Sequence, residues 1–203
     1  MGFDKLAAPL AGKPVLAHTL EAFLACEAIT EIIIVCPPER FALLDETAFT
    51  KPVRRIDGGA ARHLSVANGL AAVSPDAEFI AIHDAARPLV SQADILATIA
   101  AAKEHGAASL ARRVTETLKR SDENTFTSVA VPRENLWFME TPQIFQADLI
   151  HAAYAHILES DIEVTDEASA IEAYGKKVKL VPSTSPNPKI TTPADLDAIS
   201  PGK

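Results

Sequence analysis

The sequence predicts an α/β fold, and two kinds of segment support this prediction. Short apolar runs at residues 32–35 and 79–83 end in prolines or in a polar loop, which is typical of buried strands. Other stretches carry apolar residues at helical spacing. Strands that alternate with helices form a largely parallel sheet, and such a sheet binds ligands at the carboxyl ends of its strands.

Length and composition restrict the class of protein. A chain of 203 residues forms one large domain or a domain with an appendage, and 48% hydrophobic with 23% charged residues is ordinary for a globular protein. Its apolar runs fall short of the ~20 residues that a membrane helix needs, so we expect no membrane span. Residues 1–5 lack the basic and apolar pattern of a secretory signal, which predicts a cytoplasmic protein.

Charge and cysteine content narrow the functions further. A net charge of −8 argues against a general nucleic-acid-binding protein, which normally carries a basic surface. An anionic small-molecule substrate then requires a local cluster of basic residues or a bound cation. Neither Cys26 nor Cys36 has the spacing of a metal site, so we expect both to be reduced thiols in the core.

The first half of the chain predicts two pairs of a helix and a strand. Pro14 suits the first position of a helix. The β-branched run at 32–35 predicts a strand buried on both faces. A second strand at 53–56 leads through a turn at 57–59 into a helix that extends to Val73.

The middle of the chain begins with the strand at 79–83. Ser91 marks the start of the next helix, with Asp94 three residues later in an arrangement close to a capping box. Another strand is expected at 107–111. Residues 112–133 are polar and hairpin-like, which predicts a projecting arm. Because a single hairpin is marginally stable alone, we expect this arm to pack on a second copy of the chain.

The last third predicts two helices, a strand and a final helix. The first helix covers about 147–158, and Thr165 is expected to cap a second that ends at Gly175. A strand follows at 178–181. Thr192 is expected to cap the final helix, which opens with a proline.

Asp84 is the strongest candidate for chemistry because it directly follows the strand at 79–83. A carboxylate there suits a divalent cation whose other ligands are phosphates and water. Aspartate also caps helices and turns, so a structural role stays open. Arg87 suits phosphate recognition beside such a cation, or a salt bridge with Asp84 alone.

Other candidate residues give weaker signals. The glycine pair at 58–59, before Arg62 and Ser65, predicts either a structural turn or a contact to an anion or a base, because glycine allows close approach and the next helix begins with free N–H groups. Ser65 alone is typical of a helix cap. Lys5 and Lys189, taken singly, are typical of solvated surface lysines.

Six motifs become specific when they are taken together. They are residues 83–88, Gly58 and Gly59 with Arg62 and Ser65, residues 117–120, Leu136-Trp137 with Thr141-Pro142-Gln143, residues 165–169 and residues 189–191. Together they resemble motifs of the 2-C-methyl-D-erythritol 4-phosphate cytidylyltransferase family over nearly the whole chain. The resemblance implies a single Rossmann-like, three-layer nucleotidyltransferase domain over 1–203, with a mixed, mostly parallel sheet. It also implies a β-arm at about 112–136 that joins two subunits as a homodimer.

The resemblance also implies an activity. Family members transfer CMP from CTP to 2-C-methyl-D-erythritol 4-phosphate and release pyrophosphate, a step of nonmevalonate isoprenoid biosynthesis. Positioning and charge neutralisation catalyse such a transfer, so Mg²⁺ or another divalent cation is expected beside several fixed cations.

Residue roles follow from the same resemblance. The residues that match catalytic positions are Lys5, Asp84 and Lys189, with Asp84 also the metal ligand. Those that match positions around the cytosine are Gly58, Gly59 and Ser65. Those that match the methylerythritol phosphate pocket are Asp84, Arg87, Thr117, Arg133 and Thr141, with Thr117 and Arg133 on the arm and therefore reaching a neighbouring subunit's site.

One departure from the family pattern bears on activity. Family members begin with a strand and a glycine-rich turn that bears an arginine, whereas this sequence begins with Met1-Gly2, at a point that matches the end of that turn. We therefore expect this chain to bind CTP weakly, to turn over poorly and to expose the edges of neighbouring strands. Two alternatives stay open: a cytidylyltransferase for ribitol 5-phosphate or another alditol phosphate, and a catalytically silent dimerising remnant.

Overall fold

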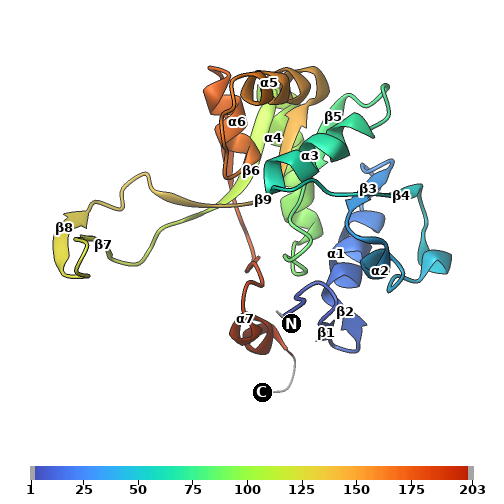
Figure 1. Cartoon of the computed structure of the whole chain (residues 1–203), viewed down its shortest axis with the longest axis horizontal. Coiled ribbons are helices and arrows are strands. Elements are labelled where there is room, and N and C mark those ends of the chain that lie inside the picture. Colours follow the sequence, from blue (N-terminus) through green and yellow to red (C-terminus); the bar gives the residue numbers. More distant parts are fainter. Residues whose placement is uncertain (1–2, 201–203) are drawn as a thin grey trace.

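The computed structural model describes residues 3–200, so Met1 and Gly2 lie outside the described residues. Its centre is a four-stranded sheet in the order β10–β6–β9–β5. The four strands are β5 (Phe79–Ile82), β6 (Ala107–Arg113), β9 (Trp137–Gln146) and β10 (Lys179–Pro182). β9 runs antiparallel to both neighbours, while β10, β6 and β5 share one direction. The predicted mixed α/β architecture is therefore confirmed (Figure 1).

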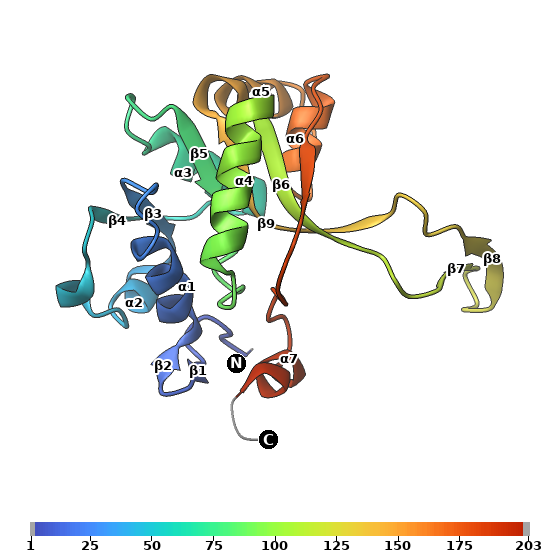
Figure 2. The ribbon, with the colours of Figure 1, turned by 180° about the vertical axis from the view of Figure 1, so that it is seen from behind.

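Helices cover both faces of this sheet because successive side chains of a strand point to opposite sides. On β9, Ile144 packs on the side of α4 (Gln92–His105). Its neighbour Phe145 packs on the side of α5 (Ala147–Glu159) and α6 (Glu167–Ala173). Figures 1 and 2 show α4 on one side of the sheet and α5 with α6 on the other, which gives three layers.

A second, two-stranded parallel sheet lies beside the first. It consists of β3 (Ile32–Val35) and β4 (Val53–Ile56), and it packs with α1 (Val15–Leu24) and α3 (Arg62–Ala71). Within residues 3–200, neither strand pairs with β5. A cavity of about 520 Å³ borders every residue of β3 and of β5. Both sheets therefore have an open edge facing this space.

The open edge changes the environment of β3. Only Ile34 of its four residues is buried, and the other three are partly exposed. The prediction that residues 32–35 are buried on both faces is therefore wrong, because one side of the strand borders the cavity instead of another strand. Among the described strands, none pairs with the outer edge of β3 or of β5.

Short elements lie near the two ends of the chain and between β3 and β4. They are β1 (Pro9–Leu10), β2 (Lys13–Pro14), α2 (Pro38–Phe41), a 3-10 helix at Glu46–Ala48 and α7 (Pro193–Ile199). Pro14 is the N-cap of α1 and not its first helical residue, which corrects the predicted position by one. Thr192 caps α7 in a full capping box with Asp195, as the sequence predicts for the cap.

A hairpin projects far from the body of the molecule (Figure 1). It consists of β7 (Leu118–Ser121) and β8 (Thr127–Val131), paired antiparallel in the segment predicted to be hairpin-like. Phe126 and Val129 on it are 72% and 52% exposed. Where the arm leaves the sheet, the Arg113 guanidinium lies 4.4 Å from the centre of the Trp137 ring, a cation–π contact. Apolar side chains at the far end of the arm are thus free to meet another surface.

The predicted cap of α4 is confirmed, whereas the predicted cap of α6 is wrong. Ser91 caps α4 by accepting a hydrogen bond from the Asp94 backbone N–H, as predicted. The Asp94 carboxylate, however, binds Thr184 and Ser185 instead of completing a capping box. For α6 the predicted cap is wrong: the Asp166 side chain, not Thr165, accepts the N-terminal hydrogen bond.

Two predictions from composition also have a structural counterpart. Cys26 and Cys36 are buried and unpaired, as expected for core thiols. Among the described residues, no helix combines the length and apolarity that a membrane crossing requires.

The divided sheet predicts uneven local stability. Amides of β3 and β4 should exchange with solvent faster than those of β6 and β9, because a two-stranded sheet beside a cavity opens at lower free energy than the centre of a four-stranded sheet. Hydrogen–deuterium exchange read by mass spectrometry measures both. Equal protection of the two regions would show that the cavity does not separate them energetically.

Candidate active site

The carboxylate of Asp84 lies among three cationic side chains just after β5. Its Oδ2 is 2.9 Å from Lys189 Nζ and 3.5 Å from Arg87 Nε, and its Oδ1 is 3.4 Å from Arg62 Nη2. The Asp84 side chain is only 12% exposed. Burial by itself raises the pKa of Asp84, but Lys189, Arg62 and Arg87 outweigh it and hold the pKa below its usual value. Asp84 is therefore an anion in a strongly cationic setting.

Thr141 fixes the backbone at this position. Burial lowers the pKa of His83 to about 4, so the ring is neutral near pH 7. Its Nε2 contacts the Arg87 carbonyl at 3.1 Å and therefore carries the proton, since a carbonyl only accepts. Nδ1 is then an acceptor, and the Thr141 hydroxyl donates to it at 3.0 Å. The same hydroxyl accepts from the Asp84 backbone N–H at 3.0 Å.

The segment after β10 brings Lys189 to Asp84, and it is anchored on both sides of the lysine. The Ile190 N–H donates to the Ala86 carbonyl at 2.8 Å. Before Lys189, the side-chain amide of Asn187 donates to the Thr141 carbonyl at 2.9 Å, and the backbone carbonyl of Asn187 accepts from the Arg87 guanidinium at 2.7 Å. These contacts hold the lysine-bearing backbone against the Asp84 loop.

A further anchor lies at the start of this segment. The fully buried Asp94 carboxylate accepts from the N–H and the hydroxyl of Thr184, at 2.9 and 2.8 Å, and from the Ser185 hydroxyl at 3.0 Å. Burial by itself raises the pKa of Asp94, but these hydrogen bonds outweigh it and lower the pKa. α4 is thereby joined to the end of β10.

Two cavities meet at the Asp84 cluster. The larger, of about 520 Å³, borders β3 and β5, and the smaller, of about 330 Å³, borders β9 and the start of α6. Arg62, Asp84 and Lys189 line both cavities. The three charged side chains thus stand where a molecule in one cavity would meet a molecule in the other.

Arg62 is itself held by a buried acid. Its two terminal nitrogens contact the two carboxylate oxygens of Glu167 at 2.6 and 3.0 Å, in the planar fork arrangement that strengthens such pairs. Glu167 is fully buried, and the Tyr154 hydroxyl donates to it at 3.1 Å. Burial and the adjacent Glu167 raise the pKa of Tyr154, so the phenol keeps its proton.

Known proteins are similar to this chain in both sequence and fold. The family model described as 2-C-methyl-D-erythritol 4-phosphate cytidylyltransferase matches residues 1–200. The protein of that name from Caldanaerobacter subterraneus subsp. tengcongensis is 40% identical over 198 residues, which cover 95% of this chain and 87% of that protein. The chain belongs to the 2-C-methyl-D-erythritol 4-phosphate cytidylyltransferase family.

Solved structures of proteins named as this enzyme are also similar to the fold of this chain. The 4-diphosphocytidyl-2C-methyl-D-erythritol synthase of Anaerococcus prevotii superposes with a TM-score of 0.87 at 30% identity, over 96% of this chain and 90% of that chain. The 2-C-methyl-D-erythritol 4-phosphate cytidylyltransferase of Thermus thermophilus gives 0.83 at 31% identity, over 96% and 91%. The family resemblance inferred from the six motifs is confirmed.

Several residues predicted from the cytidylyltransferase motifs lie at the two cavities. Lys5 and Ser65 line the larger cavity together with Asp84 and Lys189. Arg87 and Thr141 line the smaller one with the same two residues. Lys189, which is typical of a surface lysine when read singly, contacts Asp84 and is thus part of the cluster.

The glycine pair has a structural reason to be glycine. A Cβ added to Gly59 would lie 2.5 Å from Leu64 Cβ, and one added to Gly58 would lie 3.0 Å from Ser65 Oγ. The Gly59 N–H donates to Ser65 Oγ at 3.0 Å. Both glycines therefore fit the prediction of a structural turn. In the described part of the chain, neither glycine lines one of the two cavities.

Thr117 and Arg133 lie on the arm, away from the cluster. Both are exposed, and in the described part of the chain they line neither cavity. Arg133 donates to the Thr115 carbonyl within the arm. Within a single chain the structure does not bring these two residues to Asp84.

Sequence reasoning missed the residues that support the cluster. Glu167 carries no local signal of its role, since it is separated from Arg62 by 105 positions and resembles an ordinary acid in the first turn of a helix. Asn187 and Gln143 resemble surface residues by type, yet both are buried. Arg62 was detectable only as a candidate anion contact beside the glycine pair.

The residues present fit a divalent cation held partly by substrate. Among residues 3–200 there is no group of three or more His, Cys, Asp or Glu side chains arranged for a metal. Mg²⁺, however, keeps several waters and is often held by one or two carboxylates with substrate phosphates. The anionic Asp84, which borders both cavities, supplies one such carboxylate.

Thr141→Val should lower the free energy of unfolding by about 1–3 kcal/mol, because the Asp84 N–H and His83 Nδ1 lose their common partner in a buried position. Denaturant titration measures the change. Thr141→Ser keeps the hydroxyl and should keep most of the stability. A loss of stability in Thr141→Ser with none in Thr141→Val would show that the methyl group, and not the hydroxyl, matters.

Asp94→Asn should cost about 1–3 kcal/mol, because an amide nitrogen would face the Thr184 N–H or the Ser185 hydroxyl. Since the pKa of Asp94 is lowered in the fold, its charge stabilises the protein above the unfolded pKa of about 3.9, and this stabilisation is lost as the pH falls further. Melting temperatures should therefore differ from pH 8 to 5 and converge below pH 4. A constant difference down to pH 3 would contradict this account.

Proposed function

We propose that this chain transfers CMP from CTP to 2-C-methyl-D-erythritol 4-phosphate with release of pyrophosphate. The observation that carries the proposal is the cluster of Arg62, Asp84 and Lys189 between two cavities. Two substrates that must join at a phosphoryl group need one shared set of charged side chains at their meeting point. The names of the family's curated members support this reaction.

The reaction exchanges one bond for another at phosphorus. An oxygen of the acceptor phosphate bonds to the α-phosphorus of CTP, while the bond from that phosphorus to the bridging oxygen breaks and pyrophosphate leaves. Charge spreads over the phosphoryl oxygens in the transition state, so fixed cations there lower the barrier. Lys5 and Lys189 are assigned to the triphosphate, and Asp84 holds Lys189 at 2.9 Å.

The larger cavity is assigned to the nucleotide. Ser65 lines it, and the turn at Gly58 and Gly59 lies next to Ser65, so these residues are assigned to the cytosine. Asp84 would hold Mg²⁺ or another divalent cation. When bound, that cation supplies positive charge to the phosphate oxygens.

The smaller cavity is assigned to methylerythritol phosphate. Asp84, Arg87 and Thr141 border it from this chain. Thr117 and Arg133 are assigned to the same pocket of a neighbouring subunit, reached by the arm at about 112–136 of the single nucleotidyltransferase domain. Two features support a homodimer: the arm's exposed Phe126 and Val129, and the marginal stability of an isolated hairpin.

The open cavity between β3 and β5 supports the proposal that this chain transfers CMP slowly. Ser65 belongs to α3, which packs with β3 and β4, and these strands are not hydrogen-bonded to the sheet that carries Asp84. We therefore propose low CTP affinity and slow turnover for this chain. The protein is proposed to act in the cytoplasm on small molecules.

Pyrophosphate release with CTP and Mg²⁺ tests the function. Turnover should be greatest with methylerythritol phosphate in a panel that includes ribitol 5-phosphate, and chelation of the cation should abolish it. Lys189→Met should lower kcat by about 100- to 1,000-fold, because it removes a fixed cation from the phosphoryl group. Preference for ribitol 5-phosphate would reassign the acceptor, and no release with any acceptor would contradict the proposed transfer and favour the catalytically silent alternative.

Lys13→Met is the matched control. Lys13 pairs with Glu21 on an exposed face and belongs to neither cavity lining in the described chain. Its loss should leave kcat within about twofold, since exposed ion pairs contribute little. An equal loss of kcat in Lys13→Met and Lys189→Met would contradict the assigned role of Lys189.

A further inference from the structure

Glu167 is a buried charge that the proposed reaction does not explain. It is fully buried on α6, and it lines neither cavity in the described part of the chain. A buried carboxylate is costly unless it is paired and hydrogen-bonded. Its partners are Arg62, in a two-pronged contact, and the Tyr154 hydroxyl. The arrangement therefore ties one cationic side chain of the cluster to the interior.

The distances show which acid holds Arg62 more closely. Arg62 Nη1 and Nη2 lie 2.6 and 3.0 Å from the carboxylate oxygens of Glu167. The distance from Nη2 to Asp84 Oδ1 is longer, at 3.4 Å. An arginine that faced a single carboxylate would form a two-pronged contact with it. Glu167 thus keeps Arg62 from closing fully on Asp84, whose second oxygen contacts Lys189 at 2.9 Å and Arg87 at 3.5 Å.

The start of α6, which carries Glu167, is held in place by hydrogen bonds. Gln143 on β9 accepts from the Ala168 N–H at 2.9 Å and donates to the Asp166 carboxylate at 3.0 Å, which fixes the start of α6. In the sheet, Gln143 is the register partner of Ile82, two residues before Asp84. Glu167 and Asp84 are therefore both anchored to the same pair of strands.

We propose that Glu167 is a positioning residue that acts through Arg62 to keep the Asp84 carboxylate oriented and available for the transfer. This inference rests on the proposed function. Glu167 touches neither cavity, and its effect reaches the substrates only through Arg62, which borders both. Tyr154 supports Glu167 by donating to the same oxygen that Arg62 contacts most closely.

Two variants test the link at different strengths. Glu167→Gln keeps the shape but removes the charge, so Arg62 should turn towards Asp84 and kcat should fall by about 10- to 100-fold, as is typical when a supporting partner of an active-site group is lost. The KM for CTP should change by less than about threefold, because no direct substrate contact is removed. Tyr154→Phe removes one hydrogen bond and should change kcat in the same direction by a smaller factor.

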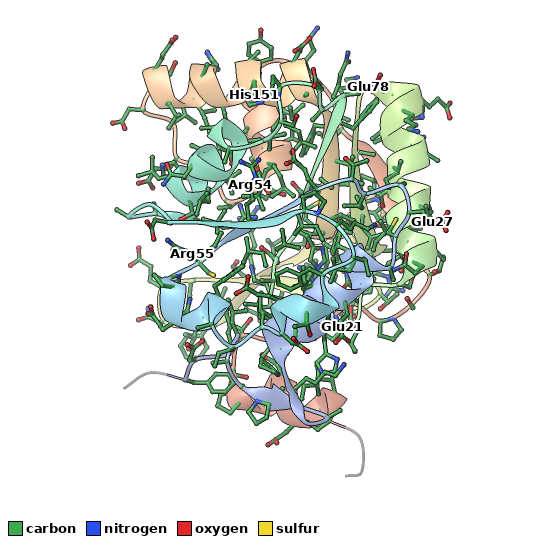
Figure 3. The ribbon with its side chains drawn as sticks, turned by 90° about the vertical axis from the view of Figure 1, so that its right-hand side faces the viewer. Glu21, Glu27, Arg54, Arg55, Glu78 and His151 are labelled. Carbon is green, nitrogen blue, oxygen red and sulfur yellow. The ribbon has the colours of Figure 1, made fainter. Side chains whose placement is uncertain are left out.

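Glu21→Gln is the matched control. Glu21 belongs to α1 and pairs with Lys13 at 2.5 Å on an exposed face, and in the described part of the chain it lines neither cavity. Glu21 is labelled in Figure 3. This variant also removes the charge of a cation-paired carboxylate, but exposed ion pairs contribute little, so it should leave kcat within about twofold.

Two readouts separate positioning from stability. In an Asp84→Asn background, Glu167→Gln should cause little further loss of kcat, since it acts through Asp84. Crystal structures should show Arg62 closer to Asp84 in Glu167→Gln than in the unaltered chain. The proposal is overturned if the losses of kcat multiply, if Glu167→Gln leaves kcat as unchanged as Glu21→Gln does, or if Arg62 stays in place.

Failure of the proposed function is recognised separately. If the unaltered chain releases no pyrophosphate with any acceptor, the assigned reaction fails. The two crystal structures then still decide whether Glu167 controls the contact between Arg62 and Asp84. An unchanged Arg62 overturns the link, and a displaced Arg62 supports it without reference to turnover.

Discussion

The placement of one carboxylate among three cations determines the rest of this site. Asp84 is mostly buried, and its charge is acceptable there only because Lys189, Arg62 and Arg87 surround it. Each cation comes from a different part of the chain, and each has its own anchor. Glu167 anchors Arg62, the Asn187 backbone carbonyl anchors Arg87, and the Ile190 backbone anchors the segment that carries Lys189. The interior of the fold is thus arranged to hold charges at the boundary of two cavities.

The second constraint is the division of the sheet. β5 carries Asp84 at its end, but its outer edge faces a cavity and not another strand. Among the described strands, β3 and β4 pair with each other and not with β5, so α3, which brings Ser65 and Arg62, is joined to the Asp84 region through side chains. The contact between Arg62 and Glu167 therefore also links the two parts of the molecule.

Local patterns predicted most of the elements, and long-range contacts explain what was missed. The apolar run before Asp84 and the cap at Thr192 depend on neighbours in sequence, so both were recognisable. β9 was recognised only as a motif, because it is rich in polar residues and contains Pro142, which is unusual inside a strand. The polar residues of β9 are buried because they bind distant segments, as Gln143 binds the start of α6. No spacing in the sequence encodes such pairings.

We propose that the nucleotide and the acceptor meet at the Asp84 cluster. A crystal structure of the chain with Mg²⁺ and a CTP analogue whose α–β bridge does not cleave tests it most directly. The account predicts the base in the larger cavity and the α-phosphate between Lys189 and Asp84, facing the smaller cavity. A triphosphate bound away from Asp84, with Lys189 and Arg62 unchanged, would contradict it.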